Sequence, residues 1–532
     1  MDRKTLIAIA ISFLILVLWQ KIIIEPRVSQ GIHASPSASP VPSNALLNDN
    51  NLNSASQYNE KMLMVEKQSA QQSLRQVSIQ TGTGPLSLSN GNSLITNWQL
   101  KDYHTEINKN SALVDLTLIT NNNKQFVFAF DDPHLSYLET SYGTLKSEPT
   151  GGLFEYEDQN IRLTKHVVAS ENQQYLDVAI MAQFKTKKPK YAFLSLFSHG
   201  TKDDQEAQDR QIVYWTNNDL ERILVQNVSK QTDVATTVKY IGTASRYFLL
   251  SVINRGLNEP RALIQPMGPL AARVSLVYPI IGDSIEIPVR VYFGPKNLES
   301  LRSAEPLLDH TVDFGWFTVF AYPLLRLLKW FYTFAGNYGV SIILLTLLLK
   351  IVTYPLTLKS MKSMKEMAKI QPQIQKLREK FKDDKEKLNK EMLILMRSHG
   401  YNPMAGCLPI LIQMPIFFAL YRVLYSSIEL YHAPFALWVT DLSSRDPYYV
   451  TPVLLSITMY IQQKLTPTTA TDPTQARMMQ FMPLIFGAFM LALPSGLTLY
   501  MLVNAVASIF QQIILNKKLG GPNVTPVVAQ AK

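Results

Sequence analysis

The sequence offers almost nothing from which a metal centre or a disulfide network could be built. Its 532 residues contain one cysteine, Cys407, and eight histidines. A single cysteine excludes an intramolecular disulfide and a multi-cysteine zinc or iron–sulfur site, and the histidines show no HxxxH or HExxH spacing. The motifs GxxxxGKS/T, GxGxxG and GxSxG, which serve nucleotide binding and serine hydrolysis, are also missing. We therefore expect no metal, no cofactor and no enzymatic activity.

Charge is scarce as well, and it is unevenly distributed. Charged residues make up 17% of the chain and hydrophobic residues 47%, whereas a typical soluble domain is about 25% charged. The net charge is +10, but residues 25–310 carry a net charge of −3 and the rest of the chain carries +13. Positive charge interleaved with apolar runs is typical of membrane loops. This distribution argues against nucleic-acid specificity and favours a membrane protein.

Residues 1–26 predict a transmembrane anchor. Two bases precede an apolar run from Leu6 to Trp19 that resumes at Ile22, close to the roughly 20 residues that span a bilayer. A cleaved signal peptide has a similar outline, but no A-x-A-like cleavage site follows closely. We expect an uncleaved anchor with a cytoplasmic N-terminus.

Residues 27–75, rich in Ser, Asn, Gln and Pro, predict a disordered linker.

Residues 76–312 predict an all-β sandwich. Apolar residues alternate with others at 285–293 and at 114–118, and FVFAF at 126–130 is a further β-rich run. Turn signals separate such segments at Asn90-Gly91, Asp131-Asp132-Pro133 and Gly151-Gly152. Many short strands between turns indicate an antiparallel sandwich. Large sandwiches can bind sugars, but no paired carboxylates or histidines require it here, so we interpret the domain as a folded scaffold.

The rest of the chain is predicted to be helical and mostly within the membrane. Residues 313–335 carry Arg326 and Lys329 among leucines and aromatics, which favours an interfacial amphipathic helix over the first half of a transmembrane hairpin. Five transmembrane helices are expected at 336–358, 405–430, 449–464, 479–494 and 496–516. Their connections are a cytoplasmic helical hairpin at 359–404, an outer loop at 431–448, a cytoplasmic loop at 465–478 and a basic cytoplasmic tail at 517–532.

The charge of the loops predicts the orientation. Residues 359–404 carry 12 Lys and Arg, and the 464–478 segment and the tail are basic, whereas the 431–448 loop has only Arg445. The positive-inside rule then places both termini in the cytoplasm and the β domain on the other side. The predicted fold is a polytopic α-helical membrane protein with six transmembrane helices, five of which form the core, and a large all-β sandwich outside the cytoplasm.

Lys350 lies inside the apolar segment SIILLTLLLKIVTYPLT. A cation at the centre of a span costs about 2.5–3.5 kcal/mol on insertion scales, and this one shares a helical face with Thr346, Thr353 and Thr357. It lies seven residues before Thr357, so its side chain could simply snorkel to the cytoplasmic interface. Other predicted spans carry two further stripes, one of Gln413, Phe417 and Tyr421 and one of Tyr500, Asn504, Ser508 and Gln511. Each stripe alone suits helix packing, but together they favour a hydrated intramembrane cavity.

The 359–404 segment predicts two amphipathic helices joined by a charged turn. Its apolar stripe breaks at Asp383-Asp384 and resumes at Leu388, Met392 and Leu395. Ordinary coiled-coil packing explains the stripe. The basic and methionine-rich surface would also suit anionic phospholipid or varied apolar clients. We assign partner contact to Met361, Met364, Met367, Lys376, Arg378 and Lys380.

A succession of blocks occurs in order within residues 338–519. It comprises YPLT at 354–357, the basic hairpin, NPMAGCLPILIQMPIFFALY at 402–421, APFALWVTDLSSRDPYY at 433–449, TPTTATDP at 466–473, FMPLIFG at 481–487 and LPSGLTLY at 493–500. The succession resembles the YidC/Oxa/Alb membrane protein insertase family, and within it the Gram-negative type with a large periplasmic domain.

The resemblance implies an insertase of the bacterial inner membrane that uses no nucleotide, with core helices around a groove open to cytoplasm and lipid. The family's positive charge on the first core helix is usually arginine. The matching residue here is Lys350, which replaces a planar, bidentate fork by a point charge. The groove and client-contact positions carried over by motif are Lys350, Thr346, Gln413, Met414, Pro415, Phe417 and Tyr500. Met501 stands where relatives can carry a second tyrosine.

The partners implied are nascent membrane proteins, the Sec translocon, the ribosome and signal recognition machinery, and anionic phospholipids. A secondary transporter or channel would also keep a cation at mid-membrane, but that class predicts inverted repeats with broken helices, and the sequence shows no such symmetry. A membrane-anchored carbohydrate-binding or sugar-modifying protein would instead place the function in residues 76–300.

Overall fold

The computed structural model describes residues 75–91, 95–108, 110–115, 125–170, 173–199, 209–381, 384–398, 403–465 and 473–518. The predicted N-terminal anchor, the linker and the end of the basic tail lie outside the described residues. The chain divides into two compact units, Met1–Val312 and Asp313–Lys532. We call the first the β unit and the second the helical unit. Each unit is described by itself.

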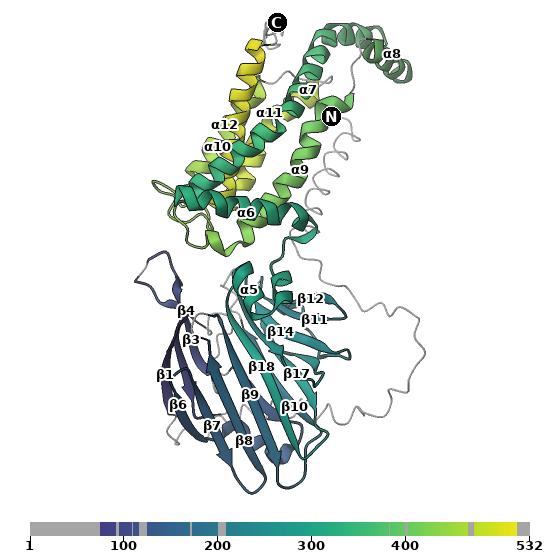
Figure 1. The fold of residues 1–532 in the computed structure, drawn as a ribbon. Coiled ribbons are helices and arrows are strands. Elements are labelled where there is room, and N and C mark those ends of the chain that lie inside the picture. Colours follow the sequence, from purple (N-terminus) through teal and green to yellow (C-terminus); the bar gives the residue numbers. More distant parts are fainter. Residues whose placement is uncertain are drawn as a thin grey trace. The chain divides into compact units, whose positions relative to one another are not determined.

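The first unit consists of antiparallel strands in sheets of four, five and nine strands (Figure 1). Their orders are β1-β2-β3-β4, β13-β16-β17-β10-β5 and β12-β11-β14-β15-β18-β9-β8-β7-β6. The five-stranded sheet packs on the nine-stranded sheet where β10 and β17 contact β14. The predicted all-β sandwich is therefore confirmed.

The strand bounds are β1 Gln76–Thr81, β2 Gly84–Ser89, β3 Ile95–His104, β4 Leu113–Asp115, β5 Val127–Phe130, β6 Thr144–Glu148, β7 Gly151–Glu157, β8 Ile161–Ala169, β9 Tyr175–Phe184, β10 Tyr191–His199, β11 Gln211–Thr216, β12 Asp219–Leu224, β13 Thr232–Val234, β14 Val238–Ala244, β15 Phe248–Asn254, β16 Arg261–Gly268, β17 Ala271–Pro279 and β18 Ser284–Pro295. Short 3-10 helices follow β5 and β12, at η2 Pro133–Thr140 and η3 Val225–Asn227.

Strand β18 shows how the alternating pattern builds the core. The five predicted inward residues, Ile285, Ile287, Val289, Val291 and Phe293, are all buried. Because β18 pairs with both β15 and β9, it lies inside the nine-stranded sheet, where alternate side chains face opposite sides. The ring of Phe293 also meets Trp98 of β3 edge to face, with centroids 5.6 Å apart. The four-stranded sheet therefore shares this core.

The predicted turn at Gly151-Gly152 is wrong. The turn between β6 and β7 falls at Pro149-Thr150, and the two glycines open strand β7. A Cβ atom on Gly151 would lie 1.9 Å from the carbonyl oxygen of Val167 on β8, and one on Gly152 would lie 2.7 Å from Cδ1 of Leu88. The glycines therefore serve the close approach of neighbouring chain segments, which a strand can require as much as a turn can.

The first unit ends in a helical segment that is held to the nine-stranded sheet by charged side chains. The segment comprises α5 (Leu298–Ala304) and η4 (Pro306–Thr311). Between them, the buried Glu305 forms ion pairs with Lys239 at 2.9 Å and with Arg255 at 3.5 Å. Arg290 of β18 donates to the carbonyl oxygen of Ala304 at 3.1 Å. This end of the unit is therefore attached to its sheet at several points.

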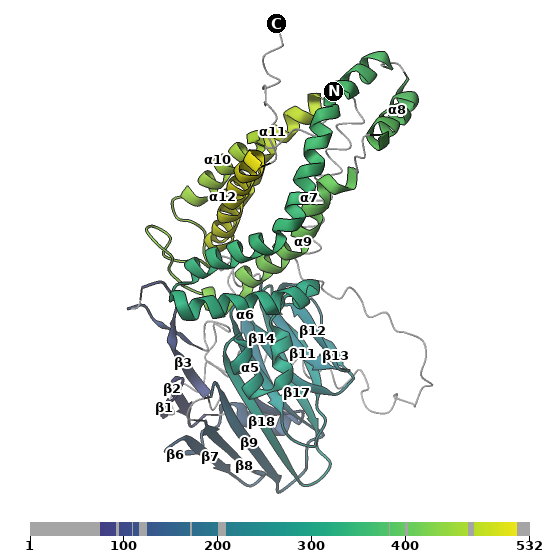
Figure 2. The same cartoon turned by 45° about the horizontal axis from the view of Figure 1, so that its top comes forward.

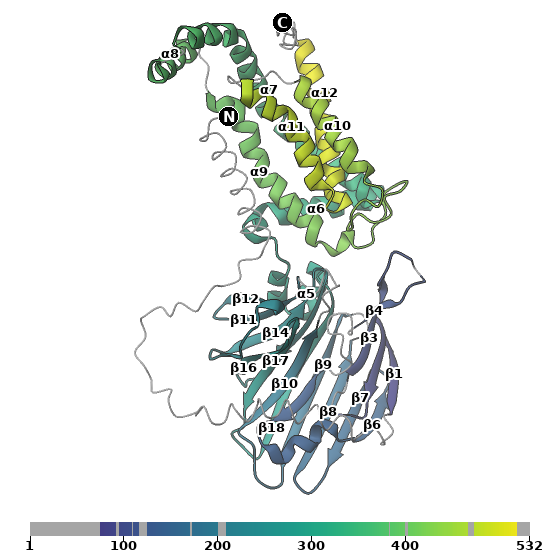
Figure 3. The same cartoon turned by 180° about the vertical axis from the view of Figure 1, so that it is seen from behind.

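The second unit is helical (Figures 2 and 3). Its helices are α6 Thr318–Ala335, α7 Tyr338–Lys380, α8 Lys385–Ser398, α9 Pro403–Ser426, α10 Val450–Leu465, α11 Pro473–Met490 and α12 Ser495–Lys518, with short 3-10 helices η5 Gly315–Phe317 and η6 Ile428–Leu430. Helix α7 packs against α6, α9 and α12, and α10 packs against α11 and α12. Helix α7 is thus the element that joins the two sides of the bundle.

Helix α7 continues without a break from the predicted span into the predicted hairpin. It is 43 residues long, so its second half forms the first arm of the hairpin. Helix α8 forms the second arm, and Ile370 and Ile374 are buried against Met392 and Leu395. The apolar stripe that predicted a packed hairpin therefore does pack in this way.

Two helices of the described part are long and apolar enough to cross a membrane. They are Tyr338–Lys362 within α7 and Ser495–Lys517 within α12, and a shorter apolar stretch lies at Gln480–Met490 within α11. The described helices alone therefore do not confirm the predicted count of six transmembrane helices.

Helix α6 presents apolar residues on two sides. Leu324, Leu325 and Leu328 are buried, in a helix that packs against α7 and α9. Trp330 and Phe334 are exposed. Aromatic side chains that face away from the helices of the bundle are typical of a membrane interface, where Trp and Tyr are enriched.

Candidate functional site

The ammonium group of Lys350 points from α7 to α12. Its Nζ atom donates a hydrogen bond to Oγ of Ser508 at 2.6 Å. One helical turn further along α12, Nε2 of Gln511 donates to the carbonyl oxygen of Lys350 at 3.5 Å. The side chain of Lys350 is half-buried. The cation predicted from the sequence thus contacts a neighbouring helix from the middle of the apolar stretch Tyr338–Lys362 of α7.

Among the described residues, the threonine hydroxyl groups on the same face of α7 bond within α7 and not to other helices. Thr346, Thr353 and Thr357 donate to the carbonyl oxygens of Ile342, Leu349 and Thr353 at 2.6, 2.8 and 3.1 Å. Such bonds back to the preceding turn are usual for threonine within helices. The polar face is therefore present as predicted, and among the described residues the side chain of this face that bonds to another helix is that of Lys350.

A second polar contact joins α9 to α12. Nε2 of Gln413 donates to the hydroxyl oxygen of Tyr500 at 3.2 Å, and Tyr500 is buried. Tyr500 and Ser508 are eight residues apart, so they lie on the same face of α12 about 12 Å from each other. We call these five residues, Lys350, Gln413, Tyr500, Ser508 and Gln511, the polar cluster. It contains three of the residues assigned from the sequence, namely Lys350, Gln413 and Tyr500, in two separate contacts, one between α7 and α12 and one between α9 and α12.

The other assigned residues lie around this cluster in different ways. Thr346 is buried, and Met414 is exposed on α9. Pro415 and Phe417 are half-buried, and the ring of Phe417 meets that of Phe418 with centroids 5.4 Å apart. Met501 packs against the buried group of Leu455, Met490 and Ala505, so the position where relatives can carry a tyrosine contributes here to the packing of α10, α11 and α12.

Ser508 and Gln511 were part of a predicted stripe but were assigned no role from the sequence. The spacing of Tyr500, Asn504, Ser508 and Gln511 indicated a shared face of one helix, yet spacing does not say which helix that face meets. The signal that could have selected Ser508 is its distance from the start of α12. It lies 13 residues after Ser495, and Lys350 lies 12 residues after Tyr338.

The loop between α9 and α10 is held by two aspartates that sequence reasoning did not single out. Asp441 accepts hydrogen bonds from the backbone and the hydroxyl of Ser443, both at 2.7 Å, and its other carboxylate oxygen lies 3.1 Å from Nδ1 of His432. Ser495, the first residue of α12, donates to the carbonyl oxygen of Asp441 at 2.7 Å. The loop that follows α9 is therefore hydrogen-bonded to the first residue of α12.

Asp446 holds the start of α10 in the same loop. Its carboxylate accepts hydrogen bonds from the backbone and the hydroxyl of Thr451, both at 2.7 Å. Burial alone would raise the pKa values of Asp441 and Asp446, but the hydrogen bonds that each receives outweigh burial and hold both pKa values below the ordinary one. Both carboxylates are therefore ionised at neutral pH.

Ion pairs also fix α6 to the end of α9. Lys329 of α6 lies 3.6 Å from Glu429, whose side chain is buried, and Arg422 of α9 lies 3.8 Å from Asp313, just before α6. Arg326, the other base predicted on the polar side of this helix, is exposed. The charges of α6 therefore partly serve attachment to the bundle.

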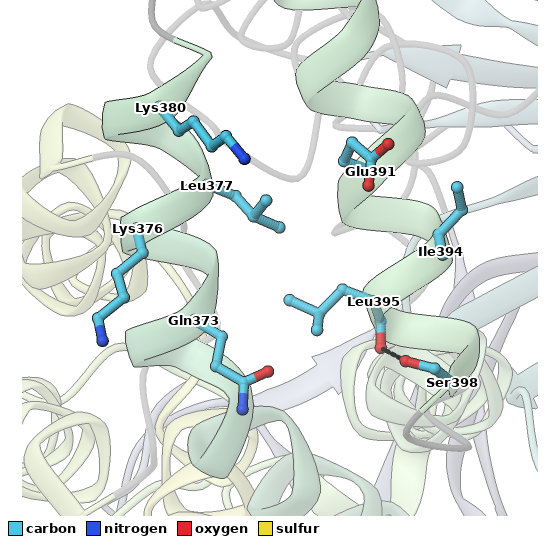
Figure 4. Close-up of a pocket in the computed structure, with 8 residues that line it drawn as sticks. All are labelled: Gln373, Lys376, Leu377, Lys380, Glu391, Ile394, Leu395 and Ser398. Atoms are coloured by element: carbon cyan, nitrogen blue, oxygen red, sulfur yellow. Dashed lines mark hydrogen bonds between the residues drawn. The ribbon is translucent and has the colours of Figure 1, made fainter.

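The hairpin carries a cleft between its two arms (Figure 4). Lys376 and Lys380 line it from α7, and Glu391 lines it from α8, with Leu377 and Leu395 between them. Of the other residues assigned to partner contact, Met361 is buried and Arg378 is half-buried. The side chains of Met364 and Met367 lie outside what the structure describes.

The chemistry available to the polar cluster is electrostatic attraction and hydrogen bonding. Among the described residues, no group of three or more His, Cys, Asp or Glu side chains could hold a metal ion. A lysine ammonium has three N–H donors and no acceptor. The cluster thus offers a cation and amide or hydroxyl groups, which suit a carboxylate or another polar group.

Two family models match the chain. One, described as the YidC periplasmic domain, matches residues 76–327, and the other, described as the 60Kd inner membrane protein, matches residues 330–521. Together they cover all the described strands and nearly all of the helical unit.

Similar curated proteins carry the name membrane protein insertase YidC. The protein of Geobacter metallireducens is 47% identical over 282 residues, which is 52% of this chain and 52% of that protein. The protein of Geotalea daltonii is 51% identical over 238 residues, 45% of each chain. The chain thus spans about half the length of these relatives. The protein of Syntrophus aciditrophicus is 38% identical over 367 residues, 67% of each chain.

A solved structure titled as an active YidC insertase with its first transmembrane domain resolved aligns with 83% of this chain and 92% of that chain, at 18% identity and a TM-score of 0.37. A TM-score this low does not by itself establish a common fold. The extent and identity of the match to the Syntrophus protein, together with both family models, lead to one conclusion: the chain belongs to the YidC family.

Proposed function

We propose that this protein inserts other proteins into the bacterial inner membrane and helps them to fold there. The observation that carries the proposal is the Lys350 ammonium group, which lies at the middle of the apolar stretch Tyr338–Lys362 and is hydrogen-bonded to a neutral hydroxyl of α12 at 2.6 Å. A charge in this position is costly for the membrane protein that keeps it. A client that supplies a carboxylate would gain from it.

In the proposed mechanism the polar cluster shortens the apolar path that a client's polar tail must cross. Lys350 attracts acidic or polar residues of the tail, and the client's hydrophobic helix then moves into lipid along α9 and α11. The driving force is the burial of that helix in lipid, together with the membrane potential, which contributes about 2.3 kcal/mol per charge for each 100 mV. The reaction needs no nucleotide, no cofactor and no metal, and the protein is not an enzyme.

The proposed client contacts are Lys350, Thr346, Gln413, Met414, Pro415, Phe417 and Tyr500. The proposed topology has six transmembrane helices, both termini in the cytoplasm and the β unit in the periplasm. The exposed aromatic side of α6 supports its placement at the outer interface. The basic hairpin and tail would receive clients from the ribosome, the signal recognition machinery or the Sec translocon, and would contact anionic phospholipid.

Site-specific photocrosslinking tests the proposed client path. A photoreactive residue at Gln413 or Phe417 should crosslink to a nascent membrane protein, because Gln413 belongs to the polar cluster and Phe417 lies one helical turn further along α9. Ile457 is exposed on α10 and serves as the matched control position. Equal crosslinking from Gln413, Phe417 and Ile457 would contradict a defined path.

Deletion of residues 370–395 tests the receiving role of the hairpin. The deletion removes the packed part of both arms, so insertion of clients should fail while the protein itself still integrates into the membrane. Insertion assays and carbonate extraction of the membranes measure the two outcomes separately. Normal insertion by the deleted protein would refute the role.

A further inference from the structure

Ser508 carries the hydroxyl group that Lys350 contacts. The donor and the acceptor in each of its two hydrogen bonds follow from the groups involved. Ser508 donates its own hydrogen to the carbonyl oxygen of Asn504 at 2.7 Å. The Lys350 ammonium group can only donate, so Ser508 Oγ accepts from it. One side chain thus links the α12 backbone to the α7 cation.

The position of Ser508 along α12 argues against snorkelling of the Lys350 side chain to the cytoplasmic interface. Lys350 and Ser508 lie 12 and 13 residues after the first residues of α7 and α12, which corresponds to a rise of about 18–20 Å in each helix. A lysine that snorkels would extend toward the second half of α7, where Lys359 and Lys362 follow. The bond to Ser508 instead extends the side chain sideways to the neighbouring helix.

Gln511 of α12 makes a second contact with Lys350. It lies three positions after Ser508, on the same face of α12, and its amide donates to the carbonyl oxygen of Lys350. Helix α12 therefore contacts both the side chain and the backbone of Lys350. The bond to Ser508 uses one of the three ammonium N–H groups, and the remaining two can donate to an incoming carboxylate.

We propose that Ser508 is a positioning residue that holds the Lys350 ammonium group at the middle of the membrane and orients it for a client's acidic residues. The proposal rests on the proposed insertase function, which it deepens by naming the residue that sets the depth of the charge. Ser508 itself does not contact the client in this account.

The matched control is Ser426 of α9. Its hydroxyl donates to the carbonyl oxygen of Arg422 at 2.6 Å, the same bond to the preceding turn that Ser508 makes, but among the described residues it accepts no bond from a lysine. The variants Ser508→Ala and Ser426→Ala therefore remove the same kind of intrahelical bond. Only the first removes the acceptor of Lys350, and Ser508→Thr restores that acceptor.

The first readout is the accessibility of Lys350, which does not depend on insertion activity. Inverted membrane vesicles that contain the full chain are treated with a membrane-impermeant amine-acylating reagent, and acylation of Lys350 is measured by mass spectrometry. Ser508→Ala should raise acylation roughly tenfold, as expected for the loss of one hydrogen bond to a charged group. Ser508→Thr and Ser426→Ala should remain at the wild-type level. Equal acylation in the wild type and Ser508→Ala would overturn the proposal.

The second readout is insertion of clients that differ only in whether their translocated tail is acidic or neutral. Ser508→Ala should lower insertion of the acidic client several-fold more than that of the neutral client. The exchange variant Lys350→Ser/Ser508→Lys carries the ammonium group on α12 with a serine opposite, and it should restore insertion that either single substitution reduces. Failure of the exchange variant, with the protein integrated in the membrane, would contradict the proposal.

The two readouts separate the positioning role from the function on which it rests. If Lys350→Gln inserts acidic clients as the wild type does, the proposed role of the cation in insertion fails, whatever the acylation shows. If Lys350→Gln is impaired but Ser508→Ala changes neither acylation nor client preference, the insertase proposal stands and the role of Ser508 is refuted.

Discussion

Glu305 in the β unit and Lys350 in the helical unit are both charged side chains within folded protein, but different kinds of group surround them. Glu305 has two cationic partners, Lys239 at 2.9 Å and Arg255 at 3.5 Å. The side-chain partner of Lys350 is the neutral hydroxyl of Ser508. The carboxylate is neutralised where it serves the fold, whereas in the proposed mechanism the ammonium group keeps its charge available to a client.

The β unit contains a second buried ion, Lys165, that sharpens this contrast. Its side chain points into the sandwich, with Nζ 5.9 Å from the ring centroid of Phe128 and 5.2 Å from that of Phe154. Burial lowers the pKa of Lys165 to about 7. Lys165 can thus lose its proton near neutral pH, which avoids the cost of a buried charge. When Lys165 is protonated, the faces of the two rings attract its ammonium group.

The largest effect on the β unit is expected from Glu305→Ala. The substitution leaves Lys239 and Arg255 without this carboxylate. Breaking a buried pair typically costs 3–5 kcal/mol, but both cations are 45% exposed and can hydrate, so we expect a loss of about 2 kcal/mol. Chemical denaturation of a fragment of residues 75–312 measures it. Exposed Glu286→Ala is the control, and an equal effect of the two substitutions would contradict the structural role of Glu305.

A pH-dependent effect is expected from Lys165. Because its pKa is about 7 in the folded unit and about 10.4 in the unfolded chain, the unfolded state binds more protons above pH 7, so stability rises with pH, by about 1.5 kcal/mol between pH 7 and 8.5. Lys165→Met should remove this rise. Denaturation of the 75–312 fragment at both pH values measures it, and a persistent rise in Lys165→Met would refute the assignment to Lys165.

The smallest effect is expected from Asp441→Asn in the loop between α9 and α10. The carboxylate has a lowered pKa, so its stabilisation is fully present above the unfolded value of about 3.9 and is lost as the pH falls through the folded value. Asp441→Asn should cost about 1 kcal/mol at pH 7 through weakened hydrogen bonds. Hydrogen exchange of residues 427–449 measures it. Faster exchange in the variant at pH 7 is expected, and unchanged exchange would refute the role of Asp441.

Local patterns predicted much of both units because the physics behind them is local. The alternation in 285–293 follows from the pleat of a strand, and the stripe through Ile374 and Leu395 follows from the period of a helix. The place of Lys350 on a polar face follows in the same way. These features depend on neighbours a few residues away, and the structure bears them out.

Contacts between distant residues could not be predicted in this way. Lys350 and Ser508 are 158 positions apart, and the spacing of each stripe identifies a face but not the helix opposite. The same holds for the pairing of Glu305 with Lys239 and for the bond between Ser495 and Asp441. Gly151-Gly152 was misjudged for a related reason, since the close approach of Val167 that requires glycine comes from another strand.

The central claim is that the charge at position 350 attracts the acidic tail of a client. Insertion of one client with an acidic or a neutral tail, by wild type, Lys350→Arg and Lys350→Glu, tests it most directly. The account predicts that Lys350→Arg inserts both clients nearly as well as the wild type, and that Lys350→Glu fails with the acidic client far more than with the neutral one. Equal, wild-type insertion of the acidic client by Lys350→Arg and Lys350→Glu would contradict the account and would make Lys350 a membrane anchor only.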